Sequence, residues 1–281
     1  MIRHVRALKI TNAAGAEWDC MRPDGFMYTP EGFGIGKDNE YMRSGIVYEK
    51  IEDISAQKQI GFQMVFKNYE VYKAFAAFAS RAPLVLAYMP LDEWAYIDGE
   101  ITSLEKAEID PEYRRLICRG TFTATSKWYI PKTARRTSEE VENPKRYTYS
   151  YDYQYMDAAS GVIRIENESA EASPASIHIM GPITDPVWSL IVNEQIIQSG
   201  ALTYDVPSGR KVVINSKDGA LSVELQRVSD GAFVRNLYQY TDFSRETFLL
   251  FPPGGSVLTV TGTASSTIEA WVELEEIYES I

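Results

Sequence analysis

The sequence predicts a mainly β protein with two domains. Residues 1–156 are expected to form an α+β N-terminal domain, with one helix on a β-sheet or barrel, and residues 157–281 an antiparallel β-sandwich. Three observations lead to this prediction. The last third alternates apolar and polar side chains in short runs, the first half has similar runs around one helical repeat, and residues 157–161 interrupt the pattern between them.

The first half begins with strand-like segments at residues 44–49 and 59–66. A helix is predicted over residues 69–81, because Asn68 is a good N-cap and Phe75 and Phe78 lie at helical spacing on one apolar face. Pro83 ends this helix. We expect its apolar face to pack on a sheet.

Further strands are predicted after the helix, at residues 84–89 and 114–125. Between them, residues 94–97 and 100–104 flank Asp98-Gly99, a pair typical of a type I′ turn. The sequence therefore predicts a β-hairpin that turns at Asp98-Gly99.

The junction between the domains has a basic part and a tyrosine-rich part. Residues 127–146 carry six basic side chains and two prolines without periodicity, which predicts an exposed, mobile loop. In the next segment, tyrosine occupies every second position from 147 to 155, so these side chains would share one face of a strand. That face either packs on its own sheet or meets another subunit. The candidate subunit-interface residues are Tyr147, Tyr149, Tyr151, Tyr153, Tyr155, Arg135, Arg136, Lys145 and Arg146.

The C-terminal third predicts seven strands. Their alternating runs cover residues 162–165, 175–179, 211–214, 221–225, 248–251, 257–260 and 269–274. Turn-forming Gly, Pro and Asp residues separate these runs, as at Asp218-Gly219 and 252–255. Strands at this spacing are typical of a sandwich.

Composition restricts the partners. The 281 residues carry a formal net charge of −11, of which residues 161–281 contribute −9. Phosphate contacts need a basic face, so direct nucleic-acid recognition is not expected. No apolar stretch approaches the roughly 20 residues of a membrane span, and the N-terminus lacks the apolar core of a signal peptide, so we expect folding in a cytoplasm.

The chemical inventory indicates no catalytic, cofactor or metal site. Cys118 lies in a strand-like run and is expected to be a buried, inert thiol; a disulfide with Cys20 stays open. Residues 32–37 (GFGIGK) lack P-loop spacing and are expected to form a glycine turn. His178 alternates with two isoleucines, which predicts a solvated surface histidine.

Three segments of the C-terminal half are distinctive: residues 181–186 (GPITDP), 206–215 (VPSGRKVVIN) and 248–258 (FLLFPPGGSVL). Together they resemble the distal tail protein (Dit) family of siphophages, in which Gly-Asn is usual where this chain has Gly255-Ser256. The aromatic helix, the strand after it and residues 122–129 (FTATSKWY) resemble the family's N-terminal half. The order of these motifs along nearly the whole chain carries the resemblance.

The resemblance implies a structural virion protein at the phage tail tip. Members of this family form a homo-hexameric ring from their N-terminal domains, and a galectin-like sandwich projects from each subunit. The ring joins the tail tube protein to a tail-tip or tail-associated lysin protein, and the outer domains of many members carry receptor-binding proteins. No enzyme activity, cofactor or membrane insertion is implied, and assembly would occur in the bacterial host cytoplasm.

Two other functions compete with this interpretation. A lectin-like module that binds host cell-wall saccharide is suggested by the sandwich and by Trp188 and Trp271, although the galectin sugar motif is missing and core packing is the expected role of both rings. A hydrolase is suggested only by abundant acids and serines, among which no pair stands out.

Overall fold

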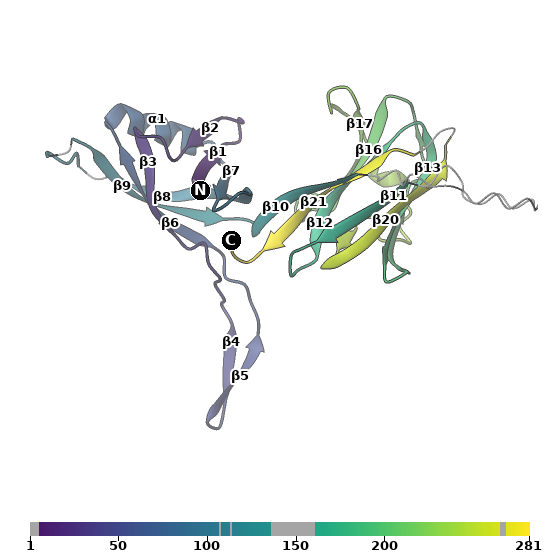
Figure 1. Cartoon of the computed structure of the whole chain (residues 1–281), viewed down its shortest axis with the longest axis horizontal. Helices are drawn as coiled ribbons and strands as arrows, with labels where there is room; N and C mark the ends of the chain where they lie inside the picture. The colour runs from purple at the N-terminus through teal and green to yellow at the C-terminus, as the bar shows by residue number, and fades with distance from the viewer. Residues whose placement is uncertain (1–5, 107, 113, 136–160, 265–267) are drawn as a thin grey trace, which may run out of the picture. The chain divides into compact units, whose positions relative to one another are not determined.

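The structure is a computed structural model that describes residues 6–106, 108–112, 114–135, 161–264 and 268–281 (Figure 1). Two compact units are present: unit 1 comprises Met1–Ile130 and Ile277–Ile281, and unit 2 comprises Pro131–Glu276. Strands predominate and one α-helix occurs in the described ranges, which confirms the predicted mainly β class. The predicted boundary at 156/157 lies outside the described residues and stays a prediction.

Unit 1 is built on one curved antiparallel sheet in the order β3-β6-β9-β8-β7-β1-β2. Its strands are β1 (Ala7–Thr11), β2 (Glu17–Asp19), β3 (Gly25–Glu31), β6 (Gln59–Phe66), β7 (Leu84–Met89), β8 (Ala95–Glu105) and β9 (Leu116–Ala124). The two ends of this order meet, because the N–H of Met27 in β3 donates to the carbonyl of Cys20 just after β2 (2.8 Å). The inward face is apolar and includes both cysteines, which are buried and form no disulfide.

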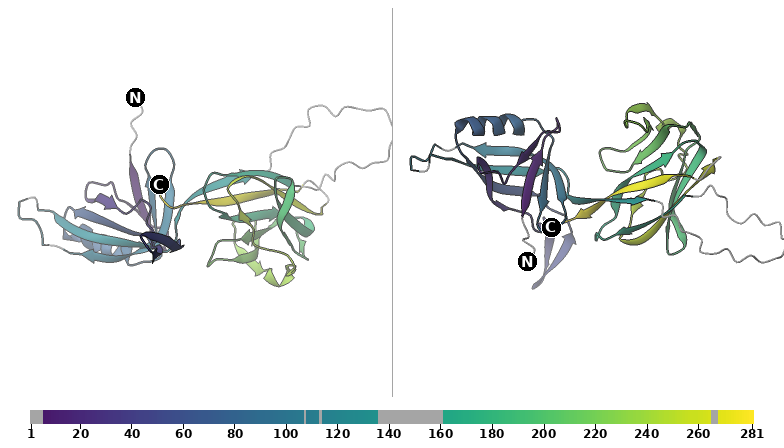
Figure 2. Two further views of the ribbon diagram at one scale, coloured as in Figure 1. Left: turned by 90° about the horizontal axis from the view of Figure 1, so that it is seen from below. Right: turned by 45° about the horizontal axis from the view of Figure 1, so that its top comes forward.

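The predicted helix is confirmed as α1 (Tyr69–Ala79), two residues shorter than expected. The Asn68 carboxamide oxygen accepts from the Val71 N–H (3.0 Å), as an N-cap should. Phe75 is fully buried and its ring meets Trp18 edge-on at 5.1 Å. The helix therefore packs its aromatic face on the sheet, along one side of unit 1 (Figure 2, right).

The predicted hairpin at Asp98-Gly99 is wrong, because β8 runs through this pair without a turn. Its first half pairs with β7 and its second half with β9, and Gly99 lies at the changeover. A Cβ on Gly99 would lie 2.3 Å from the Thr123 carbonyl oxygen and 2.6 Å from the Phe122 ring. Glycine is required here because the neighbouring strand approaches closely, and not because the chain turns.

The predicted basic loop over 127–146 is wrong in its first part, where β10 (Trp128–Arg135) is a strand. Trp128 is completely buried, with its ring edge-on to Phe33 at 5.5 Å. The inward positions of β10 include Lys132, so its alternation is not apolar and the sequence pattern hides the strand. Residues 136–146 lie outside the described part of the chain.

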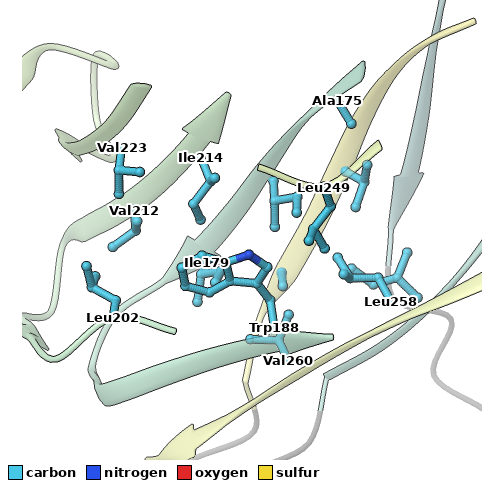
Figure 3. Close-up of a cluster of buried hydrophobic side chains, with 14 of the residues drawn as sticks. Ala175, Ile179, Trp188, Leu202, Val212, Ile214, Val223, Leu249, Leu258 and Val260 are labelled. Atoms are coloured by element: carbon cyan, nitrogen blue, oxygen red, sulfur yellow. The ribbon is translucent and has the colours of Figure 1, made fainter. Parts of the chain in front are cut away.

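Unit 2 is an antiparallel sandwich of two sheets, as predicted. One sheet has the order β18-β17-β16-β12-β21 and the other β11-β20-β13-β14. The strands are β11 (Gly161–Asn167), β12 (Ser173–Met180), β13 (Ile183–Val192), β14 (Gln195–Ala201), β15 (Asp205–Val206), β16 (Arg210–Asn215), β17 (Ser222–Arg227), β18 (Phe233–Asn236), β19 (Leu250–Phe251), β20 (Gly254–Thr263) and β21 (Ala270–Tyr278). Side chains of both sheets interdigitate around Trp188 (Figure 3).

All seven predicted strands of this unit exist, although residues 248–251 supply only the two-residue β19. Two longer strands, β13 and β14, were missed. Pro182 and Pro186 make this region read as turns, yet Pro186 lies where the register of β13 against β20 shifts. Proline is tolerated at such an irregularity because no ladder hydrogen bond is lost there.

We predict that Gly99→Ala lowers the free energy of unfolding by about 1–3 kcal/mol, because the new methyl group overlaps backbone. Gly61→Ala is the control: Gly61 lies in β6 of the same sheet, and a Cβ there meets nothing within 4 Å. Urea unfolding of both variants measures the difference. Equal stability of the two variants would contradict the close-approach explanation.

Candidate functional site

The most unusual surface of unit 1 is a hairpin arm, defined here as residues 37–55. Its strands β4 (Glu40–Ser44) and β5 (Val47–Glu52) pair only with each other in the described structure, and every residue of both is exposed. Ser44 pairs with Val47, so Gly45-Ile46 forms a two-residue turn at the tip. Figure 1 shows the arm extending away from the sheet of unit 1.

Both faces of the arm carry exposed apolar side chains, most of them opposite a polar or charged residue of the other strand. Ile46 at the tip is 96% exposed, and the side chains along the strands are at least half exposed. These side chains are Tyr41, Met42, Val47, Tyr48 and Ile51. An isolated two-stranded hairpin is marginally stable in water, and so many large apolar side chains exposed on one short element indicate an interaction site. The arm is therefore the leading candidate functional site.

The prediction of one strand over residues 44–49 is wrong, because the arm turns inside this segment at Gly45 (φ 67°). An arm with no core beneath it needs no alternation of apolar and polar residues, so the usual strand signal is missing. The signal that could have found it is the Ser44-Gly45 pair between two short apolar segments, Tyr41-Met42 and residues 46–48.

The root of the arm is attached firmly to unit 1. Residues 32–37 do not form a phosphate cradle but lead into the arm, and the Phe33 ring packs on Tyr88 at 4.8 Å. Gly32 has φ 98°, and a Cβ there would lie 2.3 Å from the Gln59 carbonyl oxygen. Lys37 and Ser55 then form a bridge that closes the base of the arm.

A carboxylate lies at this closing point. Glu279 accepts a hydrogen bond from the Ser55 hydroxyl (2.5 Å) and pairs with the ammonium of Lys127 (2.8 Å). The Lys127 and Ser55 hydrogen bonds lower the pKa of Glu279 to about 2. The group is consequently an anion over the whole range in which a folded protein is normally handled.

A polar cluster lies on the outer face of unit 2, around His178. The prediction that His178 is solvated is wrong: it occupies the outward position of β12 but is only 6% exposed, because the Trp271 ring stacks on it at 4.5 Å and 8°. Burial lowers the pKa of His178 to about 4, against the opposing effect of Glu273, whose Oε2 lies 3.5 Å from Nε2. The imidazole is therefore neutral at pH 7.

We predict that this neutral histidine makes the stability of the protein depend on pH. Between pH 6.5 and 4 an unfolded chain binds a proton at His178 and the folded protein does not, so stability falls as the pH falls through this window. Between pH 7.5 and 5 the wild type should lose about 1–2 kcal/mol more than His178→Gln in urea unfolding. Parallel pH profiles of the two proteins would refute the burial of a neutral imidazole.

Of the predicted interface residues, only Arg135 lies in the described part of the chain. It is exposed, and its guanidinium lies 5.7 Å from the centre of the Trp271 ring. Arg136, Lys145, Arg146 and the five alternating tyrosines between 147 and 155 lie outside the described residues, so their contribution to an interface stays a prediction.

The two tryptophans considered for sugar stacking have other partners. Trp188 is fully buried, with its indole N–H donating to the Thr247 carbonyl (3.1 Å), which confirms core packing. Trp271 is partly buried against His178, and its N–H donates to Glu273 (3.1 Å). Neither of these two tryptophan rings is therefore available to stack on a sugar, as the saccharide-binding alternative would need.

The described residues offer little reactive chemistry. Burial raises the pKa of the Cys20 thiol, and Cys118 is buried as predicted, so neither is an activated nucleophile. No group of three or more His, Cys, Asp or Glu side chains in the described ranges is arranged to hold a metal ion. Within the described ranges, no helix has both the length and the apolar character needed to cross a membrane.

Comparison with known proteins gives both family and fold relations. Residues 7–125 match the family model described as "Distal tail protein, N-terminal domain". A search of curated proteins finds no significant match. Among solved structures, a chain of the phage P2 baseplate in its activated conformation with Ca is similar over 99% of this chain and 100% of that one, with 17% identity and a TM-score of 0.68.

A second solved structure extends this similarity. The SPP1 Dit protein, described as a paradigm of hub adsorption apparatus in Gram-positive infecting phages, matches over 96% of this chain and 99% of that one. The identity is 8% and the TM-score 0.61. Both matches span unit 1 and unit 2, so the fold of the whole chain is shared although the sequences have diverged.

Proposed function

Because residues 7–125 form a distal tail protein N-terminal domain, as the sequence motifs predicted, we propose that the chain is a structural distal tail hub protein of a phage virion. The shared fold over both units supports this assignment. The protein acts by assembly at the tail tip and not by catalysis. Its role in this proposal is to join other tail proteins in a fixed arrangement.

The hairpin arm carries the proposal. Its apolar residues have no cover within the described part of this chain, and each side chain of this size contributes about 1.5–3 kcal/mol when it is buried. A neighbouring copy supplies that cover. The arm and the surface that receives it are different parts of the molecule, so the contact is heterologous and must close into a ring to avoid an open filament.

In this proposal the ring is a homo-hexamer of unit 1. The same ring meets the tail tube protein on one side and a tail-tip or tail-associated lysin protein on the other, while unit 2, with its predicted galectin-like character, lies outside it. The basic and tyrosine-rich positions between Arg135 and Tyr155 add a second subunit contact. Complementary charge with the acidic C-terminal part supports this contact.

We predict that the double substitution Ile46→Ser and Tyr48→Ser prevents assembly. Loss of two buried apolar side chains costs about 3 kcal/mol or more at each interface, which weakens it by roughly 100-fold. Light scattering should give about 190 kDa for six copies of the 31.7 kDa wild-type chain, and the single-chain mass for the variant.

Phe233→Ser is the matched control, since Phe233 is 61% exposed but lies in β18 of unit 2. It should assemble as the wild type does. Assembly of the arm variant at wild-type concentrations would remove the arm from the interface. A wild-type chain that stays monomeric even with the tail tube protein present would contradict the ring itself.

A further inference from the structure

The last residues of the chain return to unit 1 and end beside the root of the arm. Ile277–Ile281 belong to unit 1, and Tyr278 and Ile281 pack against its core. Glu279 lies between these two anchors. Its side chain, which is 23% exposed, reaches the base of the arm.

Glu279 contacts three segments that are distant in sequence. Its Oε1 accepts from the Ser55 hydroxyl at the end of the arm (2.5 Å), lies 2.8 Å from Lys127 Nζ just before β10, and lies 3.9 Å from Lys37 Nζ at the start of the arm. Lys37 also donates to Ser55 (3.3 Å) and pairs with Asp53 (3.6 Å). One carboxylate is thus the common acceptor at the base of the arm.

Three other hydrogen bonds cross this base in the described structure. The Asp38 N–H donates to the Ile54 carbonyl (2.9 Å), the Ile54 N–H donates to the Asn39 Oδ1 (3.0 Å), and the Ala56 N–H donates to the Gly36 carbonyl (3.1 Å). Both strands beyond this point are exposed on both faces, so no packing within unit 1 directs them. The direction of the arm consequently depends on its base, where hydrogen bonds to an ion are stronger than neutral ones.

We propose that Glu279 is a positioning residue for the arm: it fixes the arm base to the C-terminal segment and to the start of β10, and so presents the arm in the direction in which it meets a neighbour. Only the existence of that neighbour rests on the proposed function. The fixing of the base is a property of the single chain. Glu279 therefore contributes to assembly without touching the other copy.

Glu279→Gln tests this in the full-length chain. The amide keeps the size of the side chain but loses the charge that Lys127 and Lys37 pair with. Hydrogen exchange of the Asp38 and Ala56 amides, measured on dilute monomer, should become at least tenfold faster. Glu17→Gln is the control, because Glu17 also pairs with a lysine of unit 1 (Lys9, 2.9 Å) but lies in β2.

A second pair of variants shows whether the effect passes through the arm base. Ser55→Ala should accelerate the same two amides, and adding it to Glu279→Gln should produce less than the product of the single effects. If Glu279→Gln unfolds unit 1, the Ser55→Ala variant alone tests the proposal. Unchanged exchange of the Asp38 and Ala56 amides in that variant overturns it. Unchanged exchange in a folded Glu279→Gln protein overturns it as well.

Assembly provides the separate readout. With both proposals correct, Glu279→Gln should raise the concentration for half-assembly about tenfold. Faster exchange at the base, combined with assembly that is indifferent to Ile46→Ser and Tyr48→Ser, would support the positioning role and contradict the ring contact. Unchanged exchange, combined with assembly that depends on the arm, would support the ring contact and contradict the positioning role.

Discussion

The proposed assembly depends on one constraint: no described part of the chain buries the two-stranded hairpin, which exposes apolar side chains on both faces. The core of unit 1 is already complete without it, since the sheet curls until β2 and β3 meet and α1 covers the aromatic side. Exposed apolar area of this kind is unfavourable in water. Burial against another surface removes this cost, which is the physical basis of the proposed subunit contact.

The arm can bind a neighbour in a defined direction only if its root is held rigidly on unit 1. Phe33 is packed among aromatic rings, Gly32 allows a close approach to the β6 backbone, and Glu279 gathers a hydroxyl and two ammonium groups at the base. These contacts come from segments that no local pattern connects. A well-ordered root lowers the entropy lost on binding, which is how preorganisation increases affinity.

Local signals in the sequence predicted the parts that depend on local physics. Asn68 and the spacing of Phe75 and Phe78 predicted α1, and alternation predicted the sandwich strands that have one face in the core. The order of moderately specific motifs predicted a resemblance to the distal tail family, and residues 7–125 match the model of that family's N-terminal domain. Each of these features is readable within one element or along the chain order.

The errors arose where tertiary contacts override local preference. Asp98-Gly99 has turn chemistry, but the glycine is needed for the crossing of Phe122. His178 lies on the polar side of its strand, yet Trp271 from β21 covers it. The arm was missed because it has no buried face, and the role of Glu279 because its partners are 224 and 152 positions away.

The most direct test is the accessibility of the arm tip before and after assembly. A cysteine introduced by Ile46→Cys can be labelled selectively, since Cys20 and Cys118 are both buried. The account predicts rapid labelling in the monomer and at least tenfold slower labelling in the assembled ring. Equal labelling rates in the two states would show that the arm stays in solvent, and would contradict its role as the contact between subunits.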